Sequence, residues 1–336
     1  MSDRVSGADV AVLGAGAVGR RIVRHLVSAG VERISVHDTK RPAAVRVVKS
    51  SGPHVVDVDR EQALTAKVVV FAHPGDQAAD VRTVLEDGRS VVSVVDELDE
   101  YRRLADLGAL ANMRGASLVV GAGMSPGISG LLARTLADRL DEVDEIHVAI
   151  HGTGGPACAR QHHRSLAGTA QVWHDNDWIE RPGGSGRELC WFPDPAGAHD
   201  CYHGELVDPL VLHEAFPLAT RVGARMSATR RDRLTARLPM LRPPHEDGGL
   251  GGVRVEVRGS LDGMRRTLIA GIAERPSIAA GVMAGVFAVA VLEGMVPPGR
   301  IQPGRPALPT ALLVDRLRAA GLVLSEFVGA AGMATD

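Results

Sequence analysis

The stretch from Asp9 to Asp38 limits the fold of this chain more than any other, because it has the pattern of a complete βαβ unit. A short apolar run, Ala8 to Leu13, leads directly into the turn G-A-G-A-V-G. Apolar residues at helical spacing follow, Gly30 ends that helix, and a second short strand ends at Asp38. A glycine-rich turn between strand and helix, with an acidic residue about twenty positions later, predicts a dinucleotide-binding site.

Each residue of this turn has its own predicted part in binding the cofactor. Gly14 allows the tight turn, Gly16 lets the backbone approach a pyrophosphate, and Gly19 permits close packing of helix on strand. Ala17 and Val18 complete the turn at the start of the helix. We expect the pyrophosphate to lie on the free N–H groups at that helix N-terminus.

Asp38, at the end of the second strand, bears on the choice between the two nicotinamide dinucleotides. Its carboxylate can accept hydrogen bonds from the ribose hydroxyls and would repel a 2′-phosphate, which predicts NAD as the cofactor. Lys40 and Arg41 follow immediately and favour the phosphate, so NADP stays open.

Composition excludes several classes of partner. The formal net charge is −2 and there is no block of Lys and Arg, so neither nucleic acid nor an anionic membrane is predicted as a partner. Three cysteines do not make a disulfide framework, and Met1 to Val5 lack an apolar signal region, so we expect a cytoplasmic protein. Ile278 to Leu292 is apolar but shorter than the ~20 residues that span a bilayer, which predicts a buried helix.

Alternating apolar strands and helices up to Val120 predict an α/β fold, a Rossmann-type doubly wound parallel sheet. Ligands of such sheets bind beyond the carboxyl ends of the strands. The strand Lys67 to Ala72 is followed at its carboxyl end by the turn H-P-G. A second glycine-rich loop, Gly121 to Ile128, begins at the same edge of the sheet. These loops add Ala72, His73, Pro74 and Gly123 to the predicted cofactor site and Ser125 to the substrate site.

Four motifs together resemble a known family. They are G-A-G-A-V-G, H-P-G, S-V-V-S-V-V-D and G-A-G-M-S-P-G-I-S-G-L-L-A, and they are similar to those of the saccharopine dehydrogenase and lysine dehydrogenase group of NAD(P)-dependent oxidoreductases. Members of that group act on carbon–nitrogen bonds of amino acids, opines or polyamine precursors. Saccharopine reductases usually carry D-P-G where this chain has S-P-G. The resemblance implies an amino-acid or imine substrate and a homodimer.

From Asp144 onward the sequence pattern changes to short alternating strands separated by turns, which predicts an inserted α+β domain with an antiparallel sheet. By resemblance this part is the substrate-binding and dimerisation domain. We expect residues 1–125 and 280–336 to form the dinucleotide-binding domain and residues 126–279 to form the inserted one.

The chemistry of a carbon–nitrogen centre predicts which side chains to look for. A substrate carboxylate needs a cation, and proton exchange at nitrogen or water needs a group that titrates near neutral pH. Arg160 and Arg164 are the candidates for binding the substrate carboxylate. The candidate acid–base groups are His151, His162 and His163, and Trp173 is a candidate for the wall of the substrate pocket. Alternatively, the arginines are solvated at the surface, the histidines have structural roles, and the tryptophan packs in the core of the sheet.

A metal site is the weaker alternative in this sequence. His199, Cys201 and His203 share one face of a strand, but no C-x-x-C pair accompanies them, so we predict no metal.

The predicted function is an NAD(P)-dependent oxidoreductase acting on a C–N bond of an amino acid, imine or opine-like substrate. Two alternatives remain: a homospermidine synthase-like enzyme that uses NAD to transfer an aminoalkyl group, and a non-catalytic dinucleotide-binding regulatory protein.

Overall fold

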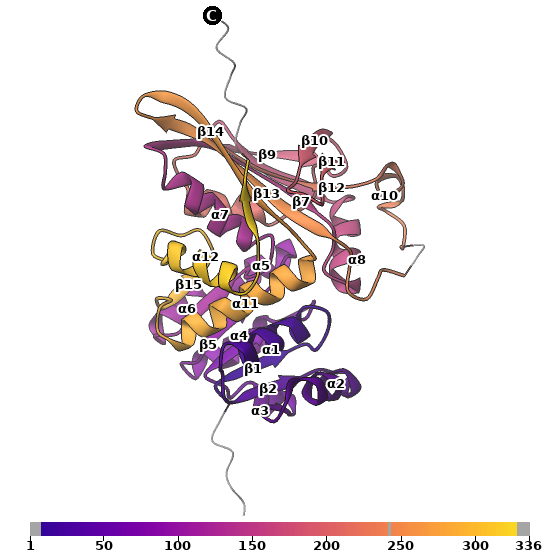
Figure 1. Ribbon diagram of the computed structural model, residues 1–336, viewed down its shortest axis with the longest axis vertical. Helices are drawn as coiled ribbons and strands as arrows, with labels where there is room; N and C mark the ends of the chain where they lie inside the picture. The colour runs from indigo at the N-terminus through magenta and orange to yellow at the C-terminus, as the bar shows by residue number, and fades with distance from the viewer. Residues whose placement is uncertain (1–7, 241–242, 328–336) are drawn as a thin grey trace, which may run out of the picture.

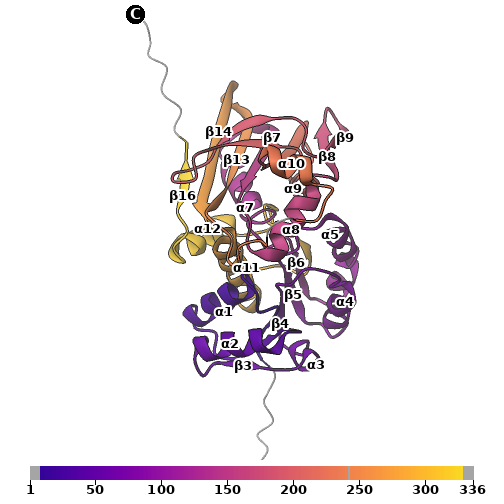
Figure 2. The same cartoon turned by 90° about the vertical axis from the view of Figure 1, so that its right-hand side faces the viewer.

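The computed structural model describes residues 8–240 and 243–327, which form two β-sheets with helices around and between them. Figure 1 shows the first sheet and its helices in the lower half of the view and the second sheet above it, with α11 (Pro276–Leu292) and α12 (Thr310–Ala319) between them. Figure 2 shows the same layers from the side. The expectation that the chain has no signal region was based on Met1 to Val5, and these residues lie outside the described ones.

Within the described residues, seven strands form the first sheet, and every pair in it is parallel. Its strands are β1 (Val10–Leu13), β2 (Ile34–His37), β3 (Val55–Asp57), β4 (Val68–Phe71), β5 (Ser90–Ser93), β6 (Ser117–Val120) and β15 (Gly299–Ile301). The spatial order β3-β2-β1-β4-β5-β6 is that of the Rossmann fold, and β15 extends the sheet beside β6. The predicted fold class is therefore confirmed.

Helices cover both faces of this sheet, because alternate residues of its strands belong to different apolar clusters. Val10 and Val12 of β1 point into one cluster, Ala11 and Leu13 into the other. The first face carries α1 (Gly19–Ser28), α2 (Arg41–Ser51) and α11; the second carries α3 (Arg60–Ala63), α4 (Ala78–Glu86), α5 (Leu98–Ala105) and α6 (Gly108–Met113).

Two glycines let α11 cross α1 at very short range. A Cβ on Gly281 would overlap the Cβ of Arg21, and one on Gly285 would overlap the ring of His25. Most of the other residues of α11 are buried apolar side chains, as expected for the apolar run from Ile278. Among the described helices, none is long and apolar enough to cross a membrane.

We expect Gly281→Val to lower the free energy of unfolding by about 2 kcal/mol, within the range typical of overpacked cores. The contacted atoms include the backbone of Arg21, so the two helices must separate to make room. Urea denaturation followed by circular dichroism measures the change. Gly249→Val is the control, because a Cβ there meets nothing within 4 Å. Equal stability of the two variants would contradict the tight crossing.

Within the described residues, nine strands form the second sheet. They are β7 (Glu142–His151), β8 (Thr169–His174), β9 (Asp177–Pro182), β10 (Glu188–Trp191), β11 (Ala198–Tyr202), β12 (Arg221–Ser227), β13 (Gly251–Leu261), β14 (Met264–Glu274) and β16 (Leu324–Glu326). The pair β7 and β12 is parallel and the other pairs are antiparallel. The second sheet is thus antiparallel, as predicted, except at this one parallel pair, which makes it a mixed sheet. The long connection between β7 and β12 contains two helices, which permits a parallel return.

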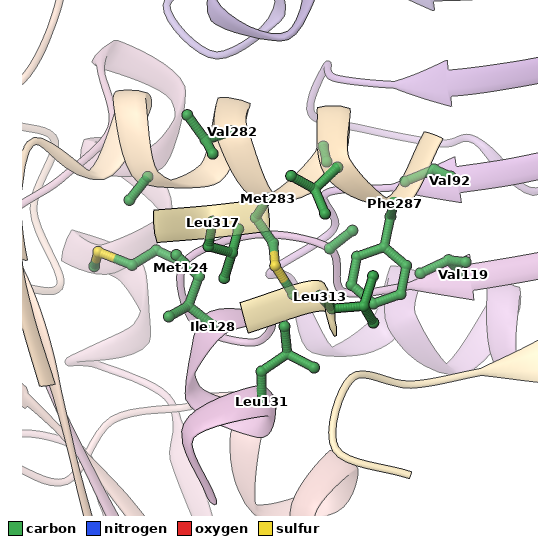
Figure 3. Close-up of a cluster of buried hydrophobic side chains, with 14 of the residues drawn as sticks. Val92, Val119, Met124, Ile128, Leu131, Val282, Met283, Phe287, Leu313 and Leu317 are labelled. Atoms are coloured by element: carbon green, nitrogen blue, oxygen red, sulfur yellow. The ribbon is translucent and has the colours of Figure 1, made fainter. Parts of the chain in front are cut away.

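A shared apolar core joins the two sheets. Its central helix, α7 (Ile128–Ala137), packs between β13 of the second sheet and helices α11 and α12. Figure 3 shows side chains from both parts of the chain in this core, among them Val92, Val119, Met124, Ile128, Leu131, Val282, Met283, Phe287, Leu313 and Leu317. Their mutual packing fixes the position of one sheet against the other.

The last part of the chain returns to both sheets. Strand β15 pairs with β6 of the parallel sheet, whereas β16 pairs with β14 of the second sheet. The division at residues 125 and 280 stays a prediction, and its outermost parts, 1–7 and 328–336, lie outside the described residues.

Candidate functional site

A cleft of about 1440 Å³ lies between the carboxyl edge of the parallel sheet and helix α8 (Pro156–Ser165) of the inserted part. Thirteen of the site residues predicted from sequence line it: Gly14, Gly16, Ala17, Val18, Asp38, Ala72, His73, Pro74, Gly123, Ser125, Arg160, His162 and Arg164. Four others, Gly19, His151, His163 and Trp173, do not.

The three glycines of the first turn have different surroundings. Gly14 has a φ of +104°, and a Cβ there would press on the backbone of Ala72. A Cβ on Gly19 would overlap the carbonyl oxygen of Gly14, so this glycine packs beneath the turn and does not face the cleft. At Gly16 a Cβ would meet nothing within 4 Å. The turn therefore has open space at the position where a pyrophosphate is expected to approach.

Asp38 holds the glycine-rich turn and the strand end together. Its Oδ2 accepts a hydrogen bond from the backbone N–H of Ala15 at 2.7 Å, and its Oδ1 accepts one from the N–H of Lys40 at 2.7 Å. The carboxylate is half-buried and lines the cleft. Arg41, which the sequence offered as a phosphate ligand, pairs with Asp57, with 3.1 Å between Nε and Oδ2.

Helix α8 forms the opposite wall and carries two arginines that face the cleft. Arg160 and Arg164 are exposed, and neither makes an ion pair with any described carboxylate. Gly155, at the start of α8, approaches the glycine-rich turn so closely that a Cβ there would lie 2.9 Å from the Cβ of Ala17. Arg164 donates one hydrogen bond to Gln161 Oε1, and the remaining N–H groups of the two guanidiniums are available to an anionic ligand in the cleft.

Three side chains of the cleft lie close together: Asp96, Cys158 and His162. Their ligand atoms are all within 4.8 Å of one another, and Cys158 Sγ lies 3.7 Å from His162 Nε2. Asp96 follows β5 at the carboxyl edge of the parallel sheet, whereas the other two lie one turn apart on α8. The group, here called the Asp–Cys–His cluster, thus joins the two walls of the cleft.

Burial perturbs all three groups of this cluster. It raises the pKa of the Asp96 carboxyl to about 6, against the hydrogen bonds to the backbone and to Cys158 that lower it. It also raises the pKa of the Cys158 thiol, with the neighbouring carboxylate adding to the effect. Burial lowers the pKa of His162 to about 4. Perturbed groups gathered in a cleft are typical of functional sites.

The two other predicted histidines have structural surroundings. His151 stacks on His199 with 3.6 Å between ring centroids, and its Nδ1 lies 2.7 Å from Ser227 Oγ. His163 is buried, and its Nε2 lies 2.9 Å and 3.0 Å from the carbonyl oxygens of Thr235 and Leu238. Because adjacent residues of a helix point in different directions, only His162 of the pair faces the cleft.

Trp173 and the alternative metal ligands also lie away from the cleft. Trp173 packs on His213, and its indole N–H donates to the carbonyl oxygen of Ala219. His199 contacts the carbonyl oxygen of Ala196 and Cys201 packs with Phe192 in a small apolar cluster. Within the described residues, His199, Cys201 and His203 do not form a group of ligand atoms, and the Asp–Cys–His cluster does.

Sequence reasoning missed Asp96 and Cys158. Two signals were present. Cys158 and His162 are four residues apart in a predicted helix, and Asp96 directly follows a predicted apolar strand of the parallel sheet.

Comparisons with known proteins agree with the dinucleotide-binding domain. A family model described as NADP oxidoreductase, coenzyme F420-dependent, matches residues 9–97. None of the curated proteins compared with the chain matches it. The match over the first domain supports a nicotinamide dinucleotide as the cofactor.

Solved structures resemble the chain over almost its whole length. Saccharopine dehydrogenase (L-Glu forming) from Saccharomyces cerevisiae has a TM-score of 0.71 at 16% identity, and the match covers 96% of this chain and 100% of that one. DAP dehydrogenase from C. glutamicum has a TM-score of 0.48 at 14% identity, covering 94% and 99%. The WlbA dehydrogenase from Bordetella pertussis has a TM-score of 0.45 at 11% identity, covering 94% and 96%. The first likeness confirms the predicted saccharopine dehydrogenase-like fold.

Proposed function

We propose that this protein is an NAD(P)-dependent oxidoreductase that acts on a C–N bond of a small carboxylate-bearing substrate, an amino acid, imine or opine. One observation carries the proposal: a glycine-rich dinucleotide turn faces Arg160, Arg164 and the Asp–Cys–His cluster across a single cleft. A dinucleotide site alone would be compatible with a regulatory role. Anion-binding and proton-exchanging groups opposite it favour an enzyme.

The cofactor residues would each act on a different part of the dinucleotide. The turn at Gly14 to Gly16 would hold the pyrophosphate at the N-terminus of α1, and Asp38 would accept hydrogen bonds from the adenosine ribose. The turns at His73 and Gly123 line the same edge of the sheet and would border the nicotinamide. When bound, the nicotinamide supplies the hydride donor or acceptor.

The opposite wall would position the substrate. Arg160 and Arg164 would bind its carboxylate, since a guanidinium can donate two parallel hydrogen bonds to one carboxylate group. That contact would direct the carbon that bears nitrogen toward the sheet edge, where the Asp–Cys–His cluster lies. The cluster would then exchange the proton at nitrogen, or at the water that attacks an imine.

The direct test measures turnover of NAD or NADP with a panel of substrates: amino acids, opines, and mixtures of an oxo acid with an amine. The absorbance of the reduced cofactor is the readout. Reduction or oxidation of the cofactor in the presence of one of these substrates would support the proposal. Product formed without net cofactor turnover would favour aminoalkyl transfer of the homospermidine synthase type. Dinucleotide binding without any product would favour the regulatory alternative. The proposed homodimer is checked by light scattering on the same preparation.

We expect NAD to bind about tenfold more tightly than NADP, a difference of about 1.4 kcal/mol. The Asp38 carboxylate would repel a 2′-phosphate, and Arg41 is paired with Asp57. Calorimetric titration of both cofactors measures the ratio. Asp38→Asn removes the charge and keeps one oxygen acceptor, so it should reduce the preference for NAD over NADP. Tighter binding of NADP by the parent protein would mean that Lys40 and its neighbours decide the choice.

A further inference from the structure

We propose that the Asp–Cys–His cluster is a binding site for one zinc ion, held by Asp96, Cys158 and His162 and open to the cleft. Binding of the ion does not depend on the proposed function, but the role we give it rests on that function. The cluster differs from the metal ligands considered from the sequence, which lie in β11 of the second sheet or directly after it.

The distances fit zinc. In a tetrahedral site, Zn–S bonds of about 2.3 Å and Zn–N bonds of about 2.0 Å place sulfur and nitrogen about 3.5 Å apart. Cys158 Sγ and His162 Nε2 are 3.7 Å apart, and a carboxylate oxygen of Asp96 lies within 4.8 Å of both. Small side-chain adjustments would bring all three atoms to one ion.

The fold holds these ligands from two elements. Cys158 and His162 are at positions i and i+4 of α8, which places them on the same face of the helix. Asp96 lies just after the carboxyl end of β5, an interior strand of the parallel sheet. Because α8 is packed against the glycine-rich turn at Gly155 and Ala17, this contact helps to set the position of the α8 ligands relative to Asp96.

The charges around the cluster also suit a cation, because the acidic side chains of Glu97 and Asp208 act on Asp96. Within the described residues, Asp96 makes no ion pair with a cationic side chain. A divalent ion would supply the missing positive charge and would deprotonate a coordinating thiol.

The donor set selects zinc among the common divalent ions. A thiolate and an imidazole suit zinc, whereas magnesium and calcium prefer oxygen ligands. Three protein ligands leave a fourth position for water, the arrangement of catalytic zinc sites, and here the cluster borders the cleft. A water bound there would have a lowered pKa. It could give one proton to the substrate nitrogen and remain as hydroxide, which makes the ion the proton-exchanging centre.

The binding experiment uses the full chain purified without chelator. We expect about one zinc per chain by elemental analysis, as a site with a single ion requires. After removal of the metal, Co²⁺ should produce a thiolate-to-cobalt charge-transfer band that zinc displaces. Cys158→Ser should abolish the band, and both Cys158→Ser and His162→Gln should weaken zinc binding at least ~100-fold, more than is typical when only a ligand-orienting group is lost.

Cys190→Ser is the matched control, because this thiol is buried in a separate apolar cluster and its loss should leave metal binding unchanged. The wild-type cobalt spectrum needs no variant, so a poorly folding mutant does not remove the test. Wild-type protein that binds neither Co²⁺ nor Zn²⁺ at millimolar concentration would overturn the site, and NAD-dependent turnover by that protein would leave the proposed oxidoreductase standing. Zinc binding that needs Cys158, in a protein without oxidoreductase activity, would support the site and overturn only its role.

Discussion

The Gly16→Val variant should lose NAD affinity by at least ~100-fold, about 2.7 kcal/mol, while it keeps its fold. A Cβ at Gly16 would meet no protein atom within 4 Å, so the folded chain can accept the larger side chain. The same space lies at the glycine-rich turn of the cleft, where the pyrophosphate must contact backbone N–H groups. The branched side chain would fill that space, so the loss should fall on binding alone.

Gly19→Val provides the contrast. A Cβ at Gly19 would overlap the carbonyl oxygen of Gly14, so this variant should lose stability as well as binding. Thermal unfolding by circular dichroism and calorimetric titration with NAD on the same samples separate the two effects. NAD binding by folded Gly16→Val at the affinity of the parent would show that the cofactor lies elsewhere.

The parallel sheet was predictable because its information is local. Strands β1 to β6 are short apolar runs, each followed by a helix, and right-handed crossovers leave few ways to order such strands. The parallel pairing of β7 with β12 was not predictable in this way. Its partners are separated by a long stretch with helices and hairpins, and nothing in the sequence of β12 marks the direction of its neighbour.

The two walls of the cleft also differ in how far local sequence predicts them. One wall is built largely from continuous loops whose glycines and acidic residue have fixed spacing, so Gly14, Gly16 and Asp38 could be placed from sequence. The other depends on how α8 is rotated against the sheet, which decides that His162 faces the cleft and His163 faces away. Asp96 escaped prediction because its importance comes from Cys158, which is distant in sequence and adjacent in space.

His162→Ala should lower turnover by at least ~100-fold without weakening NAD binding. A lost acid–base group costs about this much, and loss of a zinc ligand would remove the same centre. His162 lines the cleft and lies in the Asp–Cys–His cluster, away from the glycine-rich turn that would hold the pyrophosphate. Steady-state kinetics with the substrate found in the cofactor panel, together with NAD titration, measures both quantities.

His163→Ala is the matched control, one residue along the same helix. Its imidazole contacts the carbonyl oxygens of Thr235 and Leu238, so the variant should lose about 1–3 kcal/mol of stability and keep its turnover per folded molecule. His151→Ala should also stay within a few-fold of the parent, because its ring lies against His199 outside the cleft. Turnover that survives in His162→Ala and falls in His151→Ala would move the chemistry to the second sheet, since His151 ends β7 and stacks on a residue of β11.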